Sequence, residues 1–250
     1  MKKIIALLFV FMALNACKDE LDCCVNLQPV NVTLKFTHNW DGVPVTSSDF
    51  NQFKFVNENG ETISIEKLRY VVSNINIGNN KINHHLVNIG EDSGLELVVN
   101  EVLQGSNFVK FTFGFSDDDN VDGIYQDLNS VNFGVPLMLG GGYHYMQFDG
   151  KYKVVNNADA NFNYHAIRAA DSTNSNPWHN LMDTSFEVDL GTFNLKSDTT
   201  IEIKMNIAEW FKNPNTWNLN ELNTVLMPNF EAQRLMNANG KTVFSLGDIN

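Results

Sequence analysis

The sequence predicts an all-β protein, an antiparallel β-sandwich with one or two short helices near its C-terminus. Apolar and polar residues alternate over several segments, which is the pattern of strands with one buried and one solvated face. Helical patterns are confined to two short stretches late in the chain. The chain has 250 residues but three cysteines, so its core does not depend on a disulfide framework.

The strand signal is clearest near the start of the domain, where every second residue from Val30 to Phe36 is apolar. Further strands are predicted at 68–77, 109–115, 143–155, 186–190, 201–207 and 243–246. A short helical turn is predicted at 208–211, and a helix at 229–238 between Pro228 and Asn239-Gly240. The polar segment 171–180 contains Pro177 and predicts a long loop.

The N-terminus predicts export and a lipid anchor. Residues 1–16 read as a signal peptide, because Lys2 and Lys3 precede an uncharged apolar run that is too short to span a bilayer. The run ends at Cys17 in a stretch that resembles a lipobox, in which the cysteine is acylated. Residues 17–28 would then be the anchor and linker, and residues 29–250 the folded domain. The alternative is an ordinary secretory peptide in which Cys17 is incidental.

Location and charge narrow the class of partner. The sequence after the anchor cysteine, Lys18-Asp19-Glu20, resembles a surface-export tag, although a solvated linker would have the same composition. We therefore expect an outer-membrane lipoprotein, exposed on the cell surface. The net charge of −12 and the lack of a basic patch exclude nucleic acid as a partner.

The neighbouring Cys23 and Cys24 would bridge each other only with strain, which leaves soft-metal binding or pairing with another chain open.

No motif in the sequence predicts an enzyme. The chain has no HExxH, CxxC, glycine-rich phosphate loop or GxSxG nucleophile elbow. A hydrolytic triad would have to be assembled from scattered residues. We therefore expect a non-enzymatic protein.

Three of the six histidines are candidate metal ligands. His38 continues the inward face of the strand that begins near Val30, and Trp40 follows on the same face. His144 shares the parity of apolar neighbours, whereas the direction of His165 is less clear. Neutral imidazole suits copper, zinc, nickel or iron, so convergence of these rings would make a metal site. The alternative is that each is a structural histidine satisfied by a hydrogen bond.

Two other groups of residues could bear on function. His84, His85 and His179 occur in polar stretches and are expected to be exposed. Asp118, Asn120 and Asp122 precede Gly123 with the spacing at which a calcium loop begins, but Asn129 replaces the glutamate of the twelfth position. Both a calcium-stabilised turn and an ordinary acidic hairpin turn remain open.

The order of several segments resembles the MbnP-like proteins, secreted or surface copper-binding proteins related to the partner of methanobactin. The matching segments are VNVTLKFTHNWDGVPV, ENGETISIEKLRYVVSNINI, VKFTFGFSDDDN, GGGYHYMQFDGKY, NFNYHAI and IEIKMNIAEWFKNPNTWNL. The resemblance implies a β-sandwich and a mononuclear copper site built from histidines. His38, His144 and His165 all fall in matching segments and are carried over as its ligands.

The resemblance also implies a role for a tryptophan. In some members a tryptophan near the metal is oxidised to kynurenine by a partner di-haem enzyme, and Trp40 is the candidate here. The chain departs from the family just before its Gly-Tyr motif, where residues 135–139 contain no tryptophan. This departure bears on the tryptophan chemistry more than on the fold.

Two functions follow as expectations. The leading one is a lipoprotein that captures or handles a transition metal, preferably copper, at the cell envelope. The alternative is a surface binding module without a metal. In that case the polar loop with Trp178 would contact a glycan or a protein partner.

Overall fold

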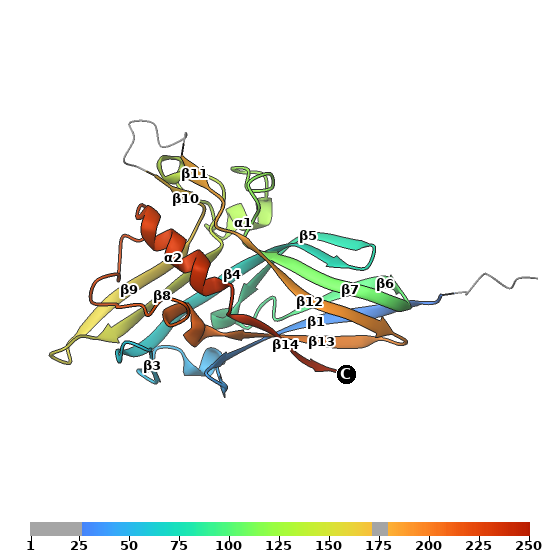
Figure 1. The fold of residues 1–250 in the computed structure, drawn as a ribbon, viewed down its shortest axis with the longest axis horizontal. Helices are drawn as coiled ribbons and strands as arrows, with labels where there is room; N and C mark the ends of the chain where they lie inside the picture. Colours follow the sequence, from blue (N-terminus) through green and yellow to red (C-terminus); the bar gives the residue numbers. More distant parts are fainter. Residues whose placement is uncertain (1–26, 172–179) are drawn as a thin grey trace, which may run out of the picture.

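Two β-sheets pack face to face in the computed structural model, which describes residues 27–171 and 180–250 (Figure 1). The strands are β1 (Pro29–Trp40), β2 (Val43–Pro44), β3 (Phe55–Val56), β4 (Thr62–Ile77), β5 (Asn80–Asn88), β6 (Glu96–Leu103), β7 (Gly105–Phe113), β8 (Met146–Lys153), β9 (Asp159–Ala166), β10 (Ala169–Ala170), β11 (Leu181–Met182), β12 (Phe186–Leu195), β13 (Thr199–Asn206) and β14 (Phe244–Ile249). The α-helices are α1 (Gln126–Ser130) and α2 (Phe230–Gly240), and the 3-10 turns are η1 (Ser47–Asp49), η2 (Ile89–Glu91), η3 (Leu137–Leu139) and η5 (Ile207–Phe211). The predicted all-β sandwich is confirmed.

The smaller sheet has five strands and is centred on β1. One edge of β1 pairs with β13 and the other with β6 and β2. The pairing of β1 with β13 is parallel, from Val32 opposite Thr199 to Asn39 opposite Asn206. All other pairings between named strands of the two large sheets are antiparallel within the described residues. The sequence pattern did not distinguish this one parallel pair.

The larger sheet has seven strands and is organised by the long strand β4. The first half of β4 pairs with β3 and β8, and its second half pairs with β5 and β7. The strand β9 extends the sheet beyond β8, and β12 extends it beyond β7. A short ribbon of β10 and β11 stands apart from both large sheets.

Aromatic side chains fill the space between the sheets. Phe36 of β1 packs edge-on against Tyr70 of β4 and Phe111 of β7, with ring centroids 6.4 and 6.5 Å apart. From η5, Trp210 and Phe211 add two fully buried rings. The alternation predicted for the first strand is confirmed, because every second residue from Val30 to Trp40 is buried.

The predicted C-terminal elements are present with slightly different limits. The turn predicted at 208–211 is η5, the helix predicted at 229–238 is α2, and the closing strand is β14. Asn229 caps α2 by accepting a hydrogen bond from the Ala232 N–H at 3.0 Å. The five-residue helix α1 lies mid-chain and was not anticipated. Its polar sequence has no apolar periodicity to mark it.

Several predictions fall on residues outside the described ranges. These are the signal peptide at 1–16, the anchor Cys17, the pair Cys23 and Cys24, and Trp178 and His179 of the polar loop. Among the described residues, no helix is both long and apolar enough to cross a membrane.

Candidate metal centre

Two of the predicted histidines lie together on the outer face of the larger sheet. The rings of His144 and His165 meet edge to face, with centroids 5.3 Å apart and an interplanar angle of 82°. His165 lies on β9 opposite Gln147 of β8, so the hairpin register places it on the face of Gln147 and Asp149. His144 precedes β8, which begins only at Met146.

The direction of His144 differs from the prediction. Strand alternation with Met146 and Phe148 would have turned its side chain towards the space between the sheets. Instead, the backbone N–H of His144 donates to the Phe133 carbonyl, outside the ladder of β8. Because alternation does not extend beyond the end of a strand, the ring is free to turn to the outer face, where it meets His165.

A carboxylate fixes the ring of His165. Its Nε2 lies 2.7 Å from Oδ1 of Asp149, and since a carboxylate only accepts, this nitrogen carries the proton. Asp149 also accepts from Asn163 Nδ2 at 2.7 Å and pairs with the Lys67 ammonium at 3.0 Å. Burial acts to raise the pKa of the Asp149 carboxyl, but hydrogen bonds from His165 and Asn163 outweigh it and hold that pKa well below its usual range. Asp149 is therefore a carboxylate at neutral pH.

A backbone carbonyl fixes the ring of His144. Its Nδ1 lies 2.9 Å from the Phe133 oxygen, which can only accept, so the proton is on Nδ1 and the lone pair on Nε2. The side chain is buried, with 5% exposed. Burial lowers the pKa of His144 to about 4, although the Phe133 carbonyl acts in the opposite direction. The ring is thus neutral at physiological pH.

Polar side chains of the sheet hold the Phe133 loop in place. Arg69 of β4 donates to the Val131 carbonyl at 2.9 Å and lies 5.3 Å from the Phe133 ring centroid. Gln147 donates to the Asn132 carbonyl at 3.2 Å and accepts from Arg69 Nε at 2.8 Å. These contacts position the carbonyl that orients His144.

The remaining nitrogens of the pair are candidate metal donors. His144 Nε2 and His165 Nδ1 are buried and have no hydrogen-bond partner within 27–171 and 180–250. A metal about 2.0–2.1 Å from an imidazole nitrogen lies about 3 Å from the ring centre, so the centroid separation of 5.3 Å leaves the two rings near enough to share an ion. The bonds to Phe133 and Asp149 match the outer contacts that orient metal-binding histidines.

His38 is not part of this pair. Its Nε2 lies 3.1 Å from the Tyr70 hydroxyl, on the face of β4 that looks into the core. Tyr70 and Arg69 are consecutive in a strand and point to opposite faces, so the larger sheet separates His38 from His144 and His165. In the described ranges, no three histidine, cysteine or acidic side chains form a group that could hold a metal. The predicted set of three histidines is therefore not brought together.

Trp40 shares the inward face of β1 with His38 but has separate contacts. Its ring stacks on Phe55 and Phe211, with centroids 5.0 and 5.8 Å apart. Its indole N–H donates to the Val56 carbonyl at 3.0 Å. Trp40 is thus a buried core residue, remote from the paired histidines on the outer face.

Comparison with known proteins places this architecture in a family. The family model MbnP matches residues 29–228, which is most of the chain. The chain belongs to the MbnP family. Among solved structures, it is similar to MbnP from Methylosinus trichosporium, with 9% identity, a TM-score of 0.42, and coverage of 74% of this chain and 78% of that chain. No curated protein sequence matches it.

His84 and His85 of this MbnP-family chain are less exposed than predicted. His84 and His85 lie on β5, which pairs with β4, and not in a loop. His85 stacks on Phe36, with centroids 5.7 Å apart, and its Nε2 lies 2.8 Å from the Gly94 carbonyl. His84 Nε2 contacts Asp127 at 2.8 Å. The expectation that both are exposed was wrong, because polar residues within an edge strand resemble a loop in composition.

The geometry of the acidic turn favours its structural interpretation. Asn120 is buried, and its side-chain oxygen accepts a hydrogen bond from the Tyr143 N–H at 2.8 Å. Asp118 and Asp122 are exposed. Asn120 thus joins the turn to the segment that leads into β8. A calcium-stabilised turn at these three residues stays a prediction, and it would have to use an oxygen that already has a partner.

Asp149 was not predicted as a site residue, although it lies in the MbnP-like segment GGGYHYMQFDGKY. A signal was available, because Gln147 and Asp149 alternate with the apolar Met146 and Phe148 and so face away from the core. The hairpin register then brings Asp149 beside His165.

Proposed function

We propose that this protein binds one transition-metal ion, preferably copper, between His144 and His165 and handles that metal at the cell envelope. The observation that carries the proposal is the pair of buried imidazole nitrogens without hydrogen-bond partners among the described residues. A buried nitrogen of this kind is costly unless it is used, and imidazole is a good ligand for copper. Membership of the MbnP family supports the choice of copper.

The neighbouring residues would supply orientation and charge. The Phe133 carbonyl and the Asp149 carboxylate hold the proton-bearing nitrogen of each ring, so the opposite nitrogen keeps its lone pair for the metal. The negative charge of Asp149 also favours a bound cation. Two imidazoles alone would not complete the coordination of the ion, because the described residues form no group of three histidine, cysteine or acidic ligands.

The lipid anchor is part of the proposal. The basic and apolar leader and Cys17 support export and acylation, which would place the domain outside the cytoplasm on the outer membrane. Labelling with a radioactive or alkyne-tagged fatty acid tests this step. Incorporation should be lost in Cys17→Ser, and labelling that persists in that variant would contradict the anchor site.

Copper titration of the purified protein tests the metal site. We expect about one ion per chain, with imidazole nitrogen signals in the paramagnetic resonance spectrum of the copper(II) form. The double variant His144→Ala, His165→Ala should lose this binding.

A matched control is available in His84, which also has one nitrogen on a carboxylate and a buried second nitrogen without a partner in the described residues. His84→Ala should retain copper with wild-type affinity. If the double variant keeps wild-type stoichiometry and affinity, the His144–His165 site is wrong.

A further inference from the structure

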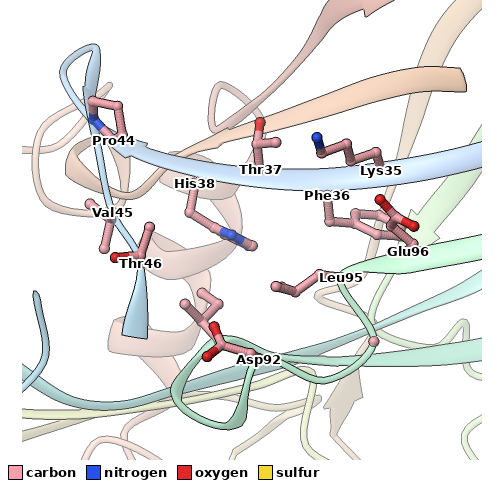
Figure 2. A pocket seen from close by; sticks show the side chains of 12 residues that line it. Lys35, Phe36, Thr37, His38, Pro44, Val45, Thr46, Asp92, Leu95 and Glu96 are labelled. Carbon is pink, nitrogen blue, oxygen red and sulfur yellow. The ribbon is translucent and has the colours of Figure 1, made fainter. Parts of the chain in front are cut away.

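A cavity of about 590 Å³ lies on the other side of β4 from the paired histidines, where β1 meets the connections around η1 and η2 (Figure 2). Phe36, Val45, Ile89 and Leu95 give it an apolar interior, and His38 forms part of its wall. Its volume is within the range of pockets that hold small organic molecules. No part of the His144–His165 site lines it.

One buried polar side chain is directed into this cavity. His38 extends from β1 into the space, and 7% of its surface is exposed (Figure 2). The Nε2 atom contacts the Tyr70 hydroxyl at 3.1 Å, whereas Nδ1 has no hydrogen-bond partner in the described part of the chain. Because His38 lines the cavity and its Nε2 is engaged with Tyr70, Nδ1 is the ring nitrogen left for a ligand.

Tyr70 determines which nitrogen of His38 carries the proton. Tyr70 is fully buried, and burial raises the pKa of its hydroxyl well above the usual value, so the O–H is retained. Its one hydrogen-bond partner in the described residues is His38 Nε2. Because an unsatisfied buried donor is costly, we assign Tyr70 as the donor and Nε2 as the acceptor. Burial lowers the pKa of His38 to about 3, so the ring is neutral and its proton is on Nδ1.

The walls of the cavity are held by hydrogen bonds on both sides of His38. The Val45 N–H donates to the His38 carbonyl at 2.9 Å, and the Phe36 N–H donates to the Leu95 carbonyl at 2.8 Å. Across the rim, the Ser47 hydroxyl donates to Asp92 at 2.7 Å, which joins η1 to the end of η2. Hydrogen-bonded backbone therefore forms the walls of the cavity on both sides of His38.

The charges at the rim disfavour an anionic ligand. Lys35, Asp92 and Glu96 are the charged residues of the lining, and all three are exposed. Two acidic groups and one basic group leave the entrance negative, in a chain whose net charge is −12. Anionic molecules are therefore repelled, and neutral molecules are not.

We propose that this cavity binds a neutral, largely apolar small molecule through one carbonyl oxygen, which accepts a hydrogen bond from His38 Nδ1–H. The apolar side chains bury the body of the ligand, and the single donor sets its orientation. This is a second site, independent of the metal proposal, because the larger sheet lies between the two. Loss of copper binding would leave it intact.

A matched pair of probes tests the donor. 2-Acetylnaphthalene and 2-ethylnaphthalene have similar shapes, but only the first has a carbonyl. Binding of both to the full-length protein is measured by calorimetry, or by fluorescence where solubility limits calorimetry. We expect both to bind at one site, and the preference for the acetyl compound to fall roughly 3- to 10-fold in His38→Phe, Tyr70→Phe. That variant removes both hydrogen-bonding partners together and so leaves no buried group unsatisfied.

The location of the site is tested by filling it. Leu95 points into the cavity (Figure 2), so Leu95→Trp should abolish binding of both probes. Leu103→Trp, at an exposed position of β6 that does not line the cavity, is the matched control and should bind normally. Failure of both probes to bind the wild-type protein, or retained binding in Leu95→Trp, would overturn the proposal.

The tautomer is tested without any ligand. Long-range proton–nitrogen correlation spectra distinguish the two ring nitrogens of a histidine, and we expect the His38 proton on Nδ1. A proton on Nε2 would overturn the proposed donor even if the probes bind. This measurement uses the wild-type protein and does not depend on whether a variant folds.

Discussion

The rings of His144 and His165 cross at 82°, and each is anchored by a hydrogen bond at the nitrogen that is not used for the proposed metal. The anchors differ in kind, since one is a neutral carbonyl and the other a carboxylate with an ammonium group beside it. The pair is thus asymmetric, and its two halves should respond differently to substitution.

Removing the charge of Asp149 should weaken metal binding. Asp149→Asn can still accept a hydrogen bond from His165 but no longer stabilises a cation, and mutation of such an outer partner typically reduces metal affinity 10- to 100-fold. Copper competition assays measure the change. Asp159→Asn removes an exposed carboxylate from the same hairpin and should leave the affinity unaltered. Equal affinities in all three proteins would show that Asp149 has no part in metal binding.

Acidification should destabilise the metal-free protein through both buried neutral histidines, His38 and His144, and the contribution of His38 can be measured separately. The pKa of His38 is lowered to about 3 by burial, from 6.5 in the unfolded chain, so between these values the unfolded state binds the extra proton. Stability is therefore lost as the pH falls from about 6.5 to about 3, by up to about 1.4 kcal/mol per pH unit. Urea unfolding at pH 6 and pH 4 measures this loss.

The variant His38→Phe, Tyr70→Phe is the control for that slope. It lacks the titrating ring, so its stability should fall by roughly 2 kcal/mol less than that of the wild type over the two pH units. Parallel losses in both proteins would mean that His38 is not the group responsible.

A methyl group at Gly150 should destabilise the domain. A Cβ there would lie 2.1 Å from the Ser64 carbonyl oxygen and 2.7 Å from the Phe162 ring, and backbone cannot retreat as a flexible side chain can. Overpacking of this kind costs about 1–3 kcal/mol, so Gly150→Ala should unfold at lower denaturant concentration. A Cβ at Gly60 would have no atom within 4 Å, but the φ of +89° at this residue is unfavourable for alanine. Gly60→Ala therefore measures the cost of backbone strain without overpacking. A Gly150→Ala protein as stable as the wild type would contradict the close packing of β8 on β4.

Asn120 should stabilise the acidic turn without calcium. Its side-chain oxygen accepts from the buried Tyr143 N–H, so Asn120→Ala leaves that donor unsatisfied and should cost about 1–3 kcal/mol. Calcium should not raise the melting temperature of the wild-type protein. A rise that depends on Asp118 and Asp122 would instead support the calcium-stabilised turn.

The sequence predicted the sandwich well, because two-residue alternation directly records which face of a strand is buried. It placed Val30–Phe36, His38 and Trp40 correctly on the inward face of β1. It could not place His144, since alternation fails beyond the end of a strand. The site pairs His144 with a carbonyl of a distant loop and His165 with Asp149 across a hairpin, and such contacts depend on register and tertiary packing rather than on local composition.

The parallel pairing of β1 with β13 has a consequence for assembly of the domain. β1 pairs with β6 on one edge, whereas the partner on its other edge, β13, comes from residues 199–206, more than 150 positions later in the chain. Contacts between such distant parts of a chain slow folding. In a chain truncated before β13, the edge of β1 that normally pairs with β13 would have free backbone hydrogen-bonding groups. An unpaired strand edge of this kind promotes aggregation with other chains. The sheet around β1 can therefore be completed only when nearly the whole domain is available.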